Sequence, residues 1–359
     1  MNLTLPSARD EAWRWSDLSA LPALAEAKPR SECELRELPW IGDGPRLLFV
    51  DGQLDREASK FDGITLGPVD ATTSHPLGAF ANGKHGWTLA LGPDHAPSAT
   101  IEIIHVATGP SHLPASIALA EDAQASIVET FIGDGWANRL TSISLASSAR
   151  LMRAIRILAS GGFVSLREEA EIGENASLTT SVLALGDAGT RFDASVTLTG
   201  EGAYAEVGGA LLARDQQKHE AAVVVRHAVP LGTSRQLWRA VADDKATASM
   251  AARAEVARDA QKTDGEQSLR GLLLQRTATI NLKPELEIFA DDVKCAHGAT
   301  VGELDANALF YLESRGLPPE RAEALLTRAF VADAIERIGD EAVREAFAKD
   351  AEAWMEMVI

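Results

Sequence analysis

The chain has 359 residues, of which 46% are hydrophobic and 24% charged, and these proportions are typical of a globular protein with a sizeable core. Its 52 acidic residues outnumber the 34 basic ones, and the formal net charge of −18 disfavours broad electrostatic binding to nucleic acid. No basic segment followed by an apolar one opens the chain, and no run of 18 apolar residues occurs, so we expect a cytoplasmic protein that does not enter a membrane. The two cysteines, Cys33 and Cys295, make no disulfide framework, which agrees with a reducing compartment.

The first 60 residues differ from the rest of the chain in their residue pattern. Short helix-like stretches such as AWRWSDLSALPALAEA alternate there with prolines and loop signals, so we expect residues 1–60 to be helical and irregular. Further along, short runs of Val, Ile, Leu, Thr and Ala are separated by Gly, Asp and Asn, which is typical of strands.

A weak internal repeat runs through these strands, with steps of 26, 24, 27 and 27 residues and small or polar turns such as AEDAQ and IGEN between units. The units begin near Ala99, Ala125, Ala149, Ala176 and Ala203. A turn-bounded period of this length, without a helix in each unit, predicts a parallel β-helix over residues 61–300, in which each coil stacks on the next. The leucine-rich consensus is missing, and a β-sandwich remains the alternative.

Helical periodicity returns after residue 300. Apolar residues recur there at helical spacing, Gly316 suits the end of a first helix, and Pro318 and Pro319 suit the start of a second. A third helix is predicted after Asp340. Residues 301–359 are therefore expected to form a small helical domain.

One stretch, KPELEIFADDVKCAHGATVGELD, places His297 two positions after Cys295. On a strand these two side chains share one face, and Asp291 would share it too. A thiolate and an imidazole suit zinc, copper or iron, but three donors fall short of a closed tetrahedral site, so a partner would have to complete it. The alternative is a buried structural cysteine beside a hydrogen-bonded histidine. A nucleophilic role is disfavoured because a base two positions along the same strand is poorly placed.

Other candidate chemistry is weaker. His219 and His227 lie eight residues apart, too far to share an ion on an extended strand, and we expect them at coil corners or on the surface. The motifs G-x-S-x-G, H-E-x-x-H and the P-loop do not occur. A carbohydrate-active β-helix, either a lyase or a hydrolase, remains the alternative function, although only 5% of the residues are aromatic and the acidic residues are spread singly.

The 283–305 block, the following ALFYLESRG and the upstream AQKTDGEQSLRGLLL and HAVPLGTSRQLWR resemble the SufB/SufD family of iron-sulfur cluster assembly proteins. The resemblance spans roughly residues 100–338, and EAWRWSDLSAL is similar to the opening of the SufD branch. It implies an N-terminal helical region, a right-handed parallel β-helix, a C-terminal helical domain and a scaffold that is not an enzyme. The SufB branch carries a sulfur-accepting cysteine within the β-helix, whereas this chain has no cysteine from residue 34 to 294, which favours the SufD branch.

The resemblance also implies partners. A SufB-like paralogue would pair through the β-helix, with Cys295 and His297 at the interface near the forming cluster, and iron or a cluster would be held there only transiently. A SufC-like ATPase would bind the C-terminal helices, and the predicted docking region is Arg315, Gly316, Leu317, Pro318, Pro319 and Glu320. An exposed terminal coil would let the isolated chain form a homodimer. No role is assigned to Cys33.

Overall fold

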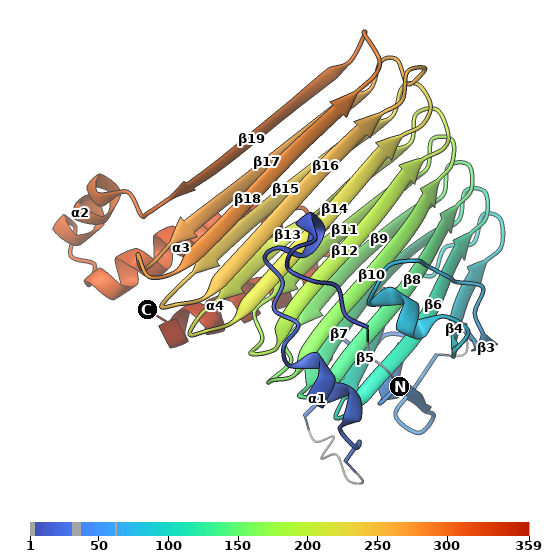
Figure 1. Ribbon diagram of the computed structural model, residues 1–359, viewed down its shortest axis with the longest axis horizontal. Coiled ribbons are helices and arrows are strands. Elements are labelled where there is room, and N and C mark those ends of the chain that lie inside the picture. The colour runs from blue at the N-terminus through green and yellow to red at the C-terminus, as the bar shows by residue number, and fades with distance from the viewer. Residues whose placement is uncertain (1–3, 31–36, 62, 359) are drawn as a thin grey trace.

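The computed structural model describes residues 4–30, 37–61 and 63–358 of the chain; Cys33 lies outside the described residues. The chain winds into a parallel β-solenoid of two facing sheets, with a group of helices after the last strand (Figure 1). Each coil contributes one strand to each sheet. The predicted β-helix is therefore confirmed, and the β-sandwich is excluded because successive coils pair in parallel within each sheet.

Sheet A has the strand order β19-β17-β15-β13-β11-β9-β7-β5-β1-β2, and sheet B has the order β18-β16-β14-β12-β10-β8-β6-β4-β3. The strands of sheet A are β1 (Arg46–Val50), β2 (Gln53–Asp55), β5 (Ile101–Ala107), β7 (Gln124–Gly133), β9 (Arg150–Ile157), β11 (Ser177–Ala184), β13 (Tyr204–Ala213), β15 (Thr233–Ala242), β17 (Asp264–Leu273) and β19 (Lys294–Gly302). The strands of sheet B are β3 (Thr65–Pro68), β4 (His85–Leu91), β6 (Pro110–Leu119), β8 (Trp136–Leu145), β10 (Phe163–Ile172), β12 (Gly189–Leu198), β14 (Lys218–His227), β16 (Thr247–Val256) and β18 (Thr279–Ile288).

The sequence repeat arises from one corner of each coil, where a residue adopts a left-handed backbone conformation. The residues at this corner are Asp94, Asp122, Ser148, Asn175 and Gly202 in the first five coils and Leu231 and Lys262 in the next two, with φ between 54° and 70°. Asp122, Ser148 and Asn175 each donate their N–H to the carbonyl of the residue before the next corner. Small and polar residues enter this conformation at the lowest cost, so the turns of the first five coils recur once per coil in the sequence.

The helices that follow the last strand are α2 (Ala306–Ser314), α3 (Pro319–Ile335) and α4 (Glu341–Val358), and they confirm the predicted helical end. Helices α3 and α4 pack along the outer face of sheet A, whereas α2 has no buried residue and packs against α3. Phe347 and Trp354 of α4 are buried in one apolar cluster with the outer face of sheet A, and Arg239 and Arg156 of that sheet pair with Asp333 and Asp350. The helices α3 and α4 are therefore held firmly against the solenoid. None of the helices in the described part of the chain is long and apolar enough to cross a membrane.

The N-terminal segment lies across the outer face of sheet B. It holds the short helices η1 (Glu11–Trp13) and α1 (Leu21–Glu26), and a further short helix, η2 (Gly78–Ala81), precedes β4. The guanidinium of Arg191 lies 3.7 Å from the Trp13 ring centroid and donates to the Ser16 hydroxyl at 2.6 Å. A buried arginine of sheet B thus anchors this segment.

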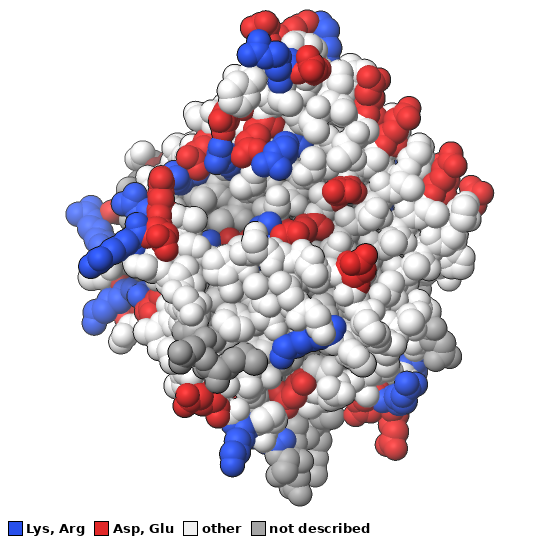
Figure 2. Space-filling model, turned by 45° about the vertical axis from the view of Figure 1, so that its right-hand side comes forward, with Lys and Arg blue, Asp and Glu red and all other residues white. Residues whose placement is uncertain are grey.

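On one face of the molecule the surface charge is dispersed (Figure 2). On the face in Figure 2, acidic side chains stand singly or in small groups with basic side chains beside some of them, and broad uncharged areas lie between. The negative net charge is therefore not gathered into one patch on this face.

Candidate functional site

Cys295 and His297 lie on β19, which forms the last coil of the solenoid together with β18 (Figure 1). β19 pairs with β17 and β18 pairs with β16, and no further strand in the described part of the chain covers either outer edge. This end of the solenoid, which we call the open end, therefore exposes two unpaired strand edges with their backbone donors and acceptors.

Both side chains point toward the interior of the solenoid at this open end. Cys295 is in register with Gly265 and His297 with Gln267, and Gly265 and Gln267 are buried on the inner face of β17. Residues paired across parallel strands present their side chains on the same face. Cys295 and His297 therefore share the inner face, with Cys295 half-buried and His297 exposed.

The expected third donor, Asp291, does not join them. β19 begins only at Lys294, so Asp291 lies in the preceding turn, where the alternation of a strand does not apply. Its neighbour Asp292 forms an ion pair with Lys262. Among the described residues, no three side chains of His, Cys, Asp or Glu lie together in a way that could hold a metal ion.

The thiol of Cys295 is in an apolar setting. It packs against a small cluster that includes Val256 and Ala290. Burial raises the pKa of this thiol, the N–H of Gly265 opposes that rise, and the carboxylate of Asp264 adds to it. Because the thiolate is the metal-binding form, binding of a metal here would release a proton. The packing alone also fits a structural cysteine.

A buried histidine lies two coils deeper. Ser234 of β15 is in register with Gly265, and a Cβ on Gly265 would lie 3.5 Å from both the Cys295 sulfur and the Ser234 hydroxyl. The Ser234 hydroxyl is 2.8 Å from Nε2 of His227, whose pKa burial lowers to about 4. His227 is therefore neutral at physiological pH.

His219 and His227 lie near the two ends of β14, next to coil corners as expected, but the alternative expectation that they lie on the surface is wrong. Both side chains are buried, because both occupy inward positions of β14 and take up space between the two sheets. Burial also lowers the pKa of His219 to about 4.

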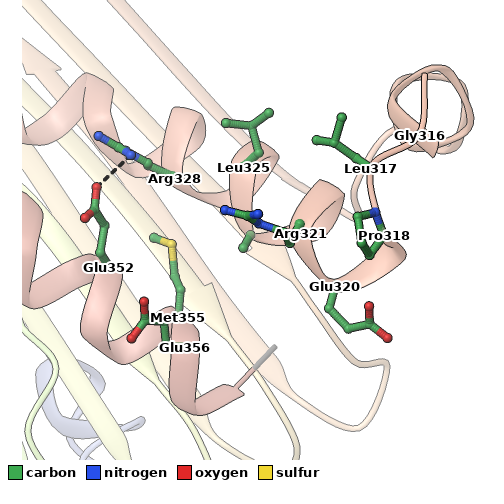
Figure 3. Close-up of a pocket in the computed structure, with 11 residues that line it drawn as sticks. Gly316, Leu317, Pro318, Glu320, Arg321, Leu325, Arg328, Glu352, Met355 and Glu356 are labelled. Atoms are coloured by element: carbon green, nitrogen blue, oxygen red, sulfur yellow. Dashed lines mark ion pairs between the residues drawn. The ribbon is translucent and has the colours of Figure 1, made fainter. Parts of the chain in front are cut away.

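A second feature is a groove of about 620 Å³ on the helical domain (Figure 3). Four of the six predicted docking residues line it, namely Gly316, Leu317, Pro318 and Glu320, whereas Arg315 and Pro319 do not. The remaining lining comes from α3 and α4: Arg321, Ala324, Leu325, Arg328, Glu352, Met355 and Glu356.

The groove combines an apolar floor with a charged rim. Met355 is buried, Leu325 is 46% exposed, and Arg328 pairs with Glu352 at 2.7 Å on one side of the groove (Figure 3). Such a surface suits an amphipathic helix of another protein. The sequence did not predict that residues of α4 line the groove, because they lie more than 30 residues further along the chain.

Residues 107–330 match the family described as SUF system FeS cluster assembly, SufBD core domain. The chain belongs to this family. It is 27% identical to the iron-sulfur cluster assembly protein SufD of Escherichia coli (strain K12) over 370 residues, which cover 95% of this chain and 87% of that protein. It is 26% identical to the SufBD family protein slr0076 of Synechocystis over 94% of this chain and 84% of that protein, and 41% identical to the chloroplastic protein ABCI7 of Arabidopsis thaliana over 32% and 25%.

The SufBD core of this chain runs from the end of β5 into α3. It includes the open end with Cys295 and His297 and the first part of the groove, but not α4. Similarity to SufD over most of the chain confirms the resemblance stated from the sequence. The roles of the individual site residues stay predictions.

Proposed function

We propose that this chain is a SufD-like scaffold subunit of a SUF complex and that it contributes Cys295 and His297 to a site where a partner subunit completes cluster assembly. The observation that carries the proposal is the position of these two donors on the inner face of an uncovered last coil, in a chain of the SufBD family. Iron and sulfide are cargo in this scheme. The chain performs no catalysis of its own and holds no cluster stably when alone.

The open end is the proposed docking surface for a SufB-like paralogue. Besides the unpaired edges of β18 and β19, it exposes the large apolar side chains Ile288, Phe289 and Val301. A second solenoid with a similar end would satisfy the free backbone groups and cover these side chains. Without that partner, a second copy of this chain is the expected occupant.

The groove on the helical domain is the proposed docking surface for a SufC-like ATPase. Because α3 and α4 are fixed to sheet A through buried apolar contacts and ion pairs, a pull on them acts on the solenoid as a whole. Only Glu303–Asp305 separate β19 from α2, so the strand that carries the site is joined directly to the helical domain. ATP-driven movement of the helices would shear the interface at the open end and expose the site to iron and sulfide.

Replacement of His297 tests the site. In a complex reconstituted with its SufB-like and SufC-like partners, we expect His297→Ala to abolish cluster formation, followed by absorbance of the cluster. The fold should survive because His297 is exposed. His85→Ala, an exposed histidine on β4 at the opposite end, is the matched control and should assemble clusters like the parent. Normal assembly by His297→Ala would overturn the site assignment.

Introducing a charged side chain into the groove tests whether the groove binds the SufC-like ATPase. Leu325→Asp should weaken co-purification of the SufC-like subunit at least about tenfold, because it places a carboxylate in an apolar contact. Met357→Asp is the control, because Met357 is another exposed apolar residue, on α4, and does not line the groove. Equal losses in both variants would show that the groove is not the docking surface.

A further inference from the structure

One inward row of the solenoid is polar at the open end. In one row of the inner face, Gln236 of β15, Gln267 of β17 and His297 of β19 are in register. The next inward row is apolar and consists of Trp238, Leu269 and Ala299. Buried polar side chains deeper in the interior, such as Arg153 and Glu168, form ion pairs with each other, whereas the two glutamines belong to no such pair, so their place in the interior calls for a reason.

The side-chain oxygen of Gln267 is a hydrogen-bond acceptor that no described residue engages. Its side chain is 2% exposed, and its Nε2 donates to the backbone carbonyl of Glu285 on β18 at 3.2 Å. This bond orients the amide, because the reverse orientation would set two oxygen atoms against each other. The Oε1 atom is buried and has no hydrogen-bond partner among the described residues. Burial of an acceptor without a hydrogen bond is unfavourable, so a ligand that engages this atom would recover stability.

We propose that Gln267 supplies Oε1 as a third donor beside Cys295 and His297, and that the three bind a divalent transition-metal ion. The proposal rests on the function given above for its choice of ion, which is ferrous iron. A thiolate, an imidazole and an amide oxygen form a mixed set of the kind that borderline metals accept. Register places Gln267 directly beside His297 on the same inner face, and Cys295 lies two residues along from His297. The partner subunit supplies the remaining positions.

The three donors are brought together only by the coil. Gln267 stands 28 residues before Cys295 in the sequence, and its neutral amide belongs to none of the usual metal-binding patterns. Stacking of β19 on β17 makes it the neighbour of His297.

Gln236 provides a matched control inside the same chain. It is 1% exposed, its Nε2 donates to the carbonyl of Arg253 at 3.1 Å, and its Oε1 is also without a partner in the described part of the chain. It lies one coil deeper, with Gln267 between it and His297. A purely structural row of glutamines would make the two residues equivalent, whereas a metal site at the open end involves Gln267 alone.

The test uses Co²⁺ as a spectroscopic probe on the full chain in a Cys33→Ser background, under anaerobic conditions. Without Cys33, a sulfur-to-cobalt absorption band reports on Cys295 alone. Gln267→Leu should weaken Co²⁺ binding at least about tenfold and alter the ligand-field bands of the cobalt. Gln267→Glu keeps an oxygen donor and should bind at least as tightly as the parent. Gln236→Leu should leave affinity and spectrum unchanged.

Three results overturn the inference: no sulfur-to-cobalt band in the parent, parental affinity and spectrum in Gln267→Leu, or equal losses in Gln236→Leu and Gln267→Leu. Gln267→Ala carries the test if the leucine variant fails to fold, as judged by circular dichroism. Loss of the band in Cys295→Ser together with an unchanged Gln267→Leu overturns this inference and leaves the proposed function standing. Normal cluster assembly by His297→Ala would instead overturn the proposed function.

Discussion

The two ends of the solenoid are built in opposite ways. At the N-terminal end, β2 and β3 run antiparallel to β1 and β4 and cover their edges, and Leu47, Leu48 and Phe49 of β1 are fully buried. At the open end, nearly every residue of β19 is exposed and every residue of β18 is at least partly exposed. A solenoid must hide its terminal rows or present them to a partner. This chain closes one end with its own strands and leaves the other available.

The open end also carries features that limit indiscriminate pairing. Pro284 stands in the middle of β18 and cannot donate a backbone hydrogen bond, and Lys283 and Lys294 place charges on the two edge strands. Proline and lysine on an edge strand disfavour aggregation with unrelated strands. The end is thus suited to a matched partner.

The largest expected difference between the two ends is in stability. Phe49→Ala at the closed end should lower the free energy of unfolding by about 3–5 kcal/mol, because it opens a cavity in a buried row. Leu286→Ala at the open end removes a half-buried side chain and should cost about 1 kcal/mol or less. Urea denaturation of the isolated chain measures both. Similar losses would show that the last coil is as well packed as the first.

The stability of the inner coils of the solenoid should also depend on pH. Burial lowers the pKa of His219 to about 4, below its ordinary value of 6.5, so the unfolded chain takes up a proton more readily than the folded chain. The stabilising effect of the neutral imidazole is present above pH 6.5 and is lost as the pH falls toward 4. We expect a loss of about 2 kcal/mol between pH 7 and pH 5 from this residue.

His219→Gln provides the corresponding measurement. Urea denaturation at the two pH values should show a smaller difference in this variant than in the parent, by the amount given above. An unchanged difference would mean that His219 is solvated and that the coils around it are not closed.

The last expected difference between the two ends concerns partner binding. Val301→Lys at the open end should reduce binding of the SufB-like subunit at least about tenfold, or roughly 1.4 kcal/mol, because it places a charge among the exposed apolar side chains. Leu66→Lys on β3 is the matched control, since this leucine is similarly exposed at the closed end. Binding of the purified partner can be measured by calorimetry. If Leu66→Lys weakens binding as much, the comparison of the two ends fails.

Much of the fold was predictable because it depends on local preferences. The corner residues recur once per coil, so the length of a coil can be read from the sequence. The spacing of apolar residues after residue 300 predicts the C-terminal helices. The shared face of Cys295 and His297 followed from the alternation of a strand. Asp291 was misplaced because a turn interrupts that alternation before β19 begins.

The sequence by itself determined the period of the coils, the helical end and the presence of a thiol and an imidazole on one strand face, since each depends on residues close together in the chain. Only the tertiary structure decided that no other strand of the described residues covers β18 and β19, that His219 and His227 are buried, that α4 completes the groove and that Gln267 lies beside His297. These features depend on which coil stacks on which and on what remains uncovered, and such contacts join residues about 30 positions apart that no local pattern connects.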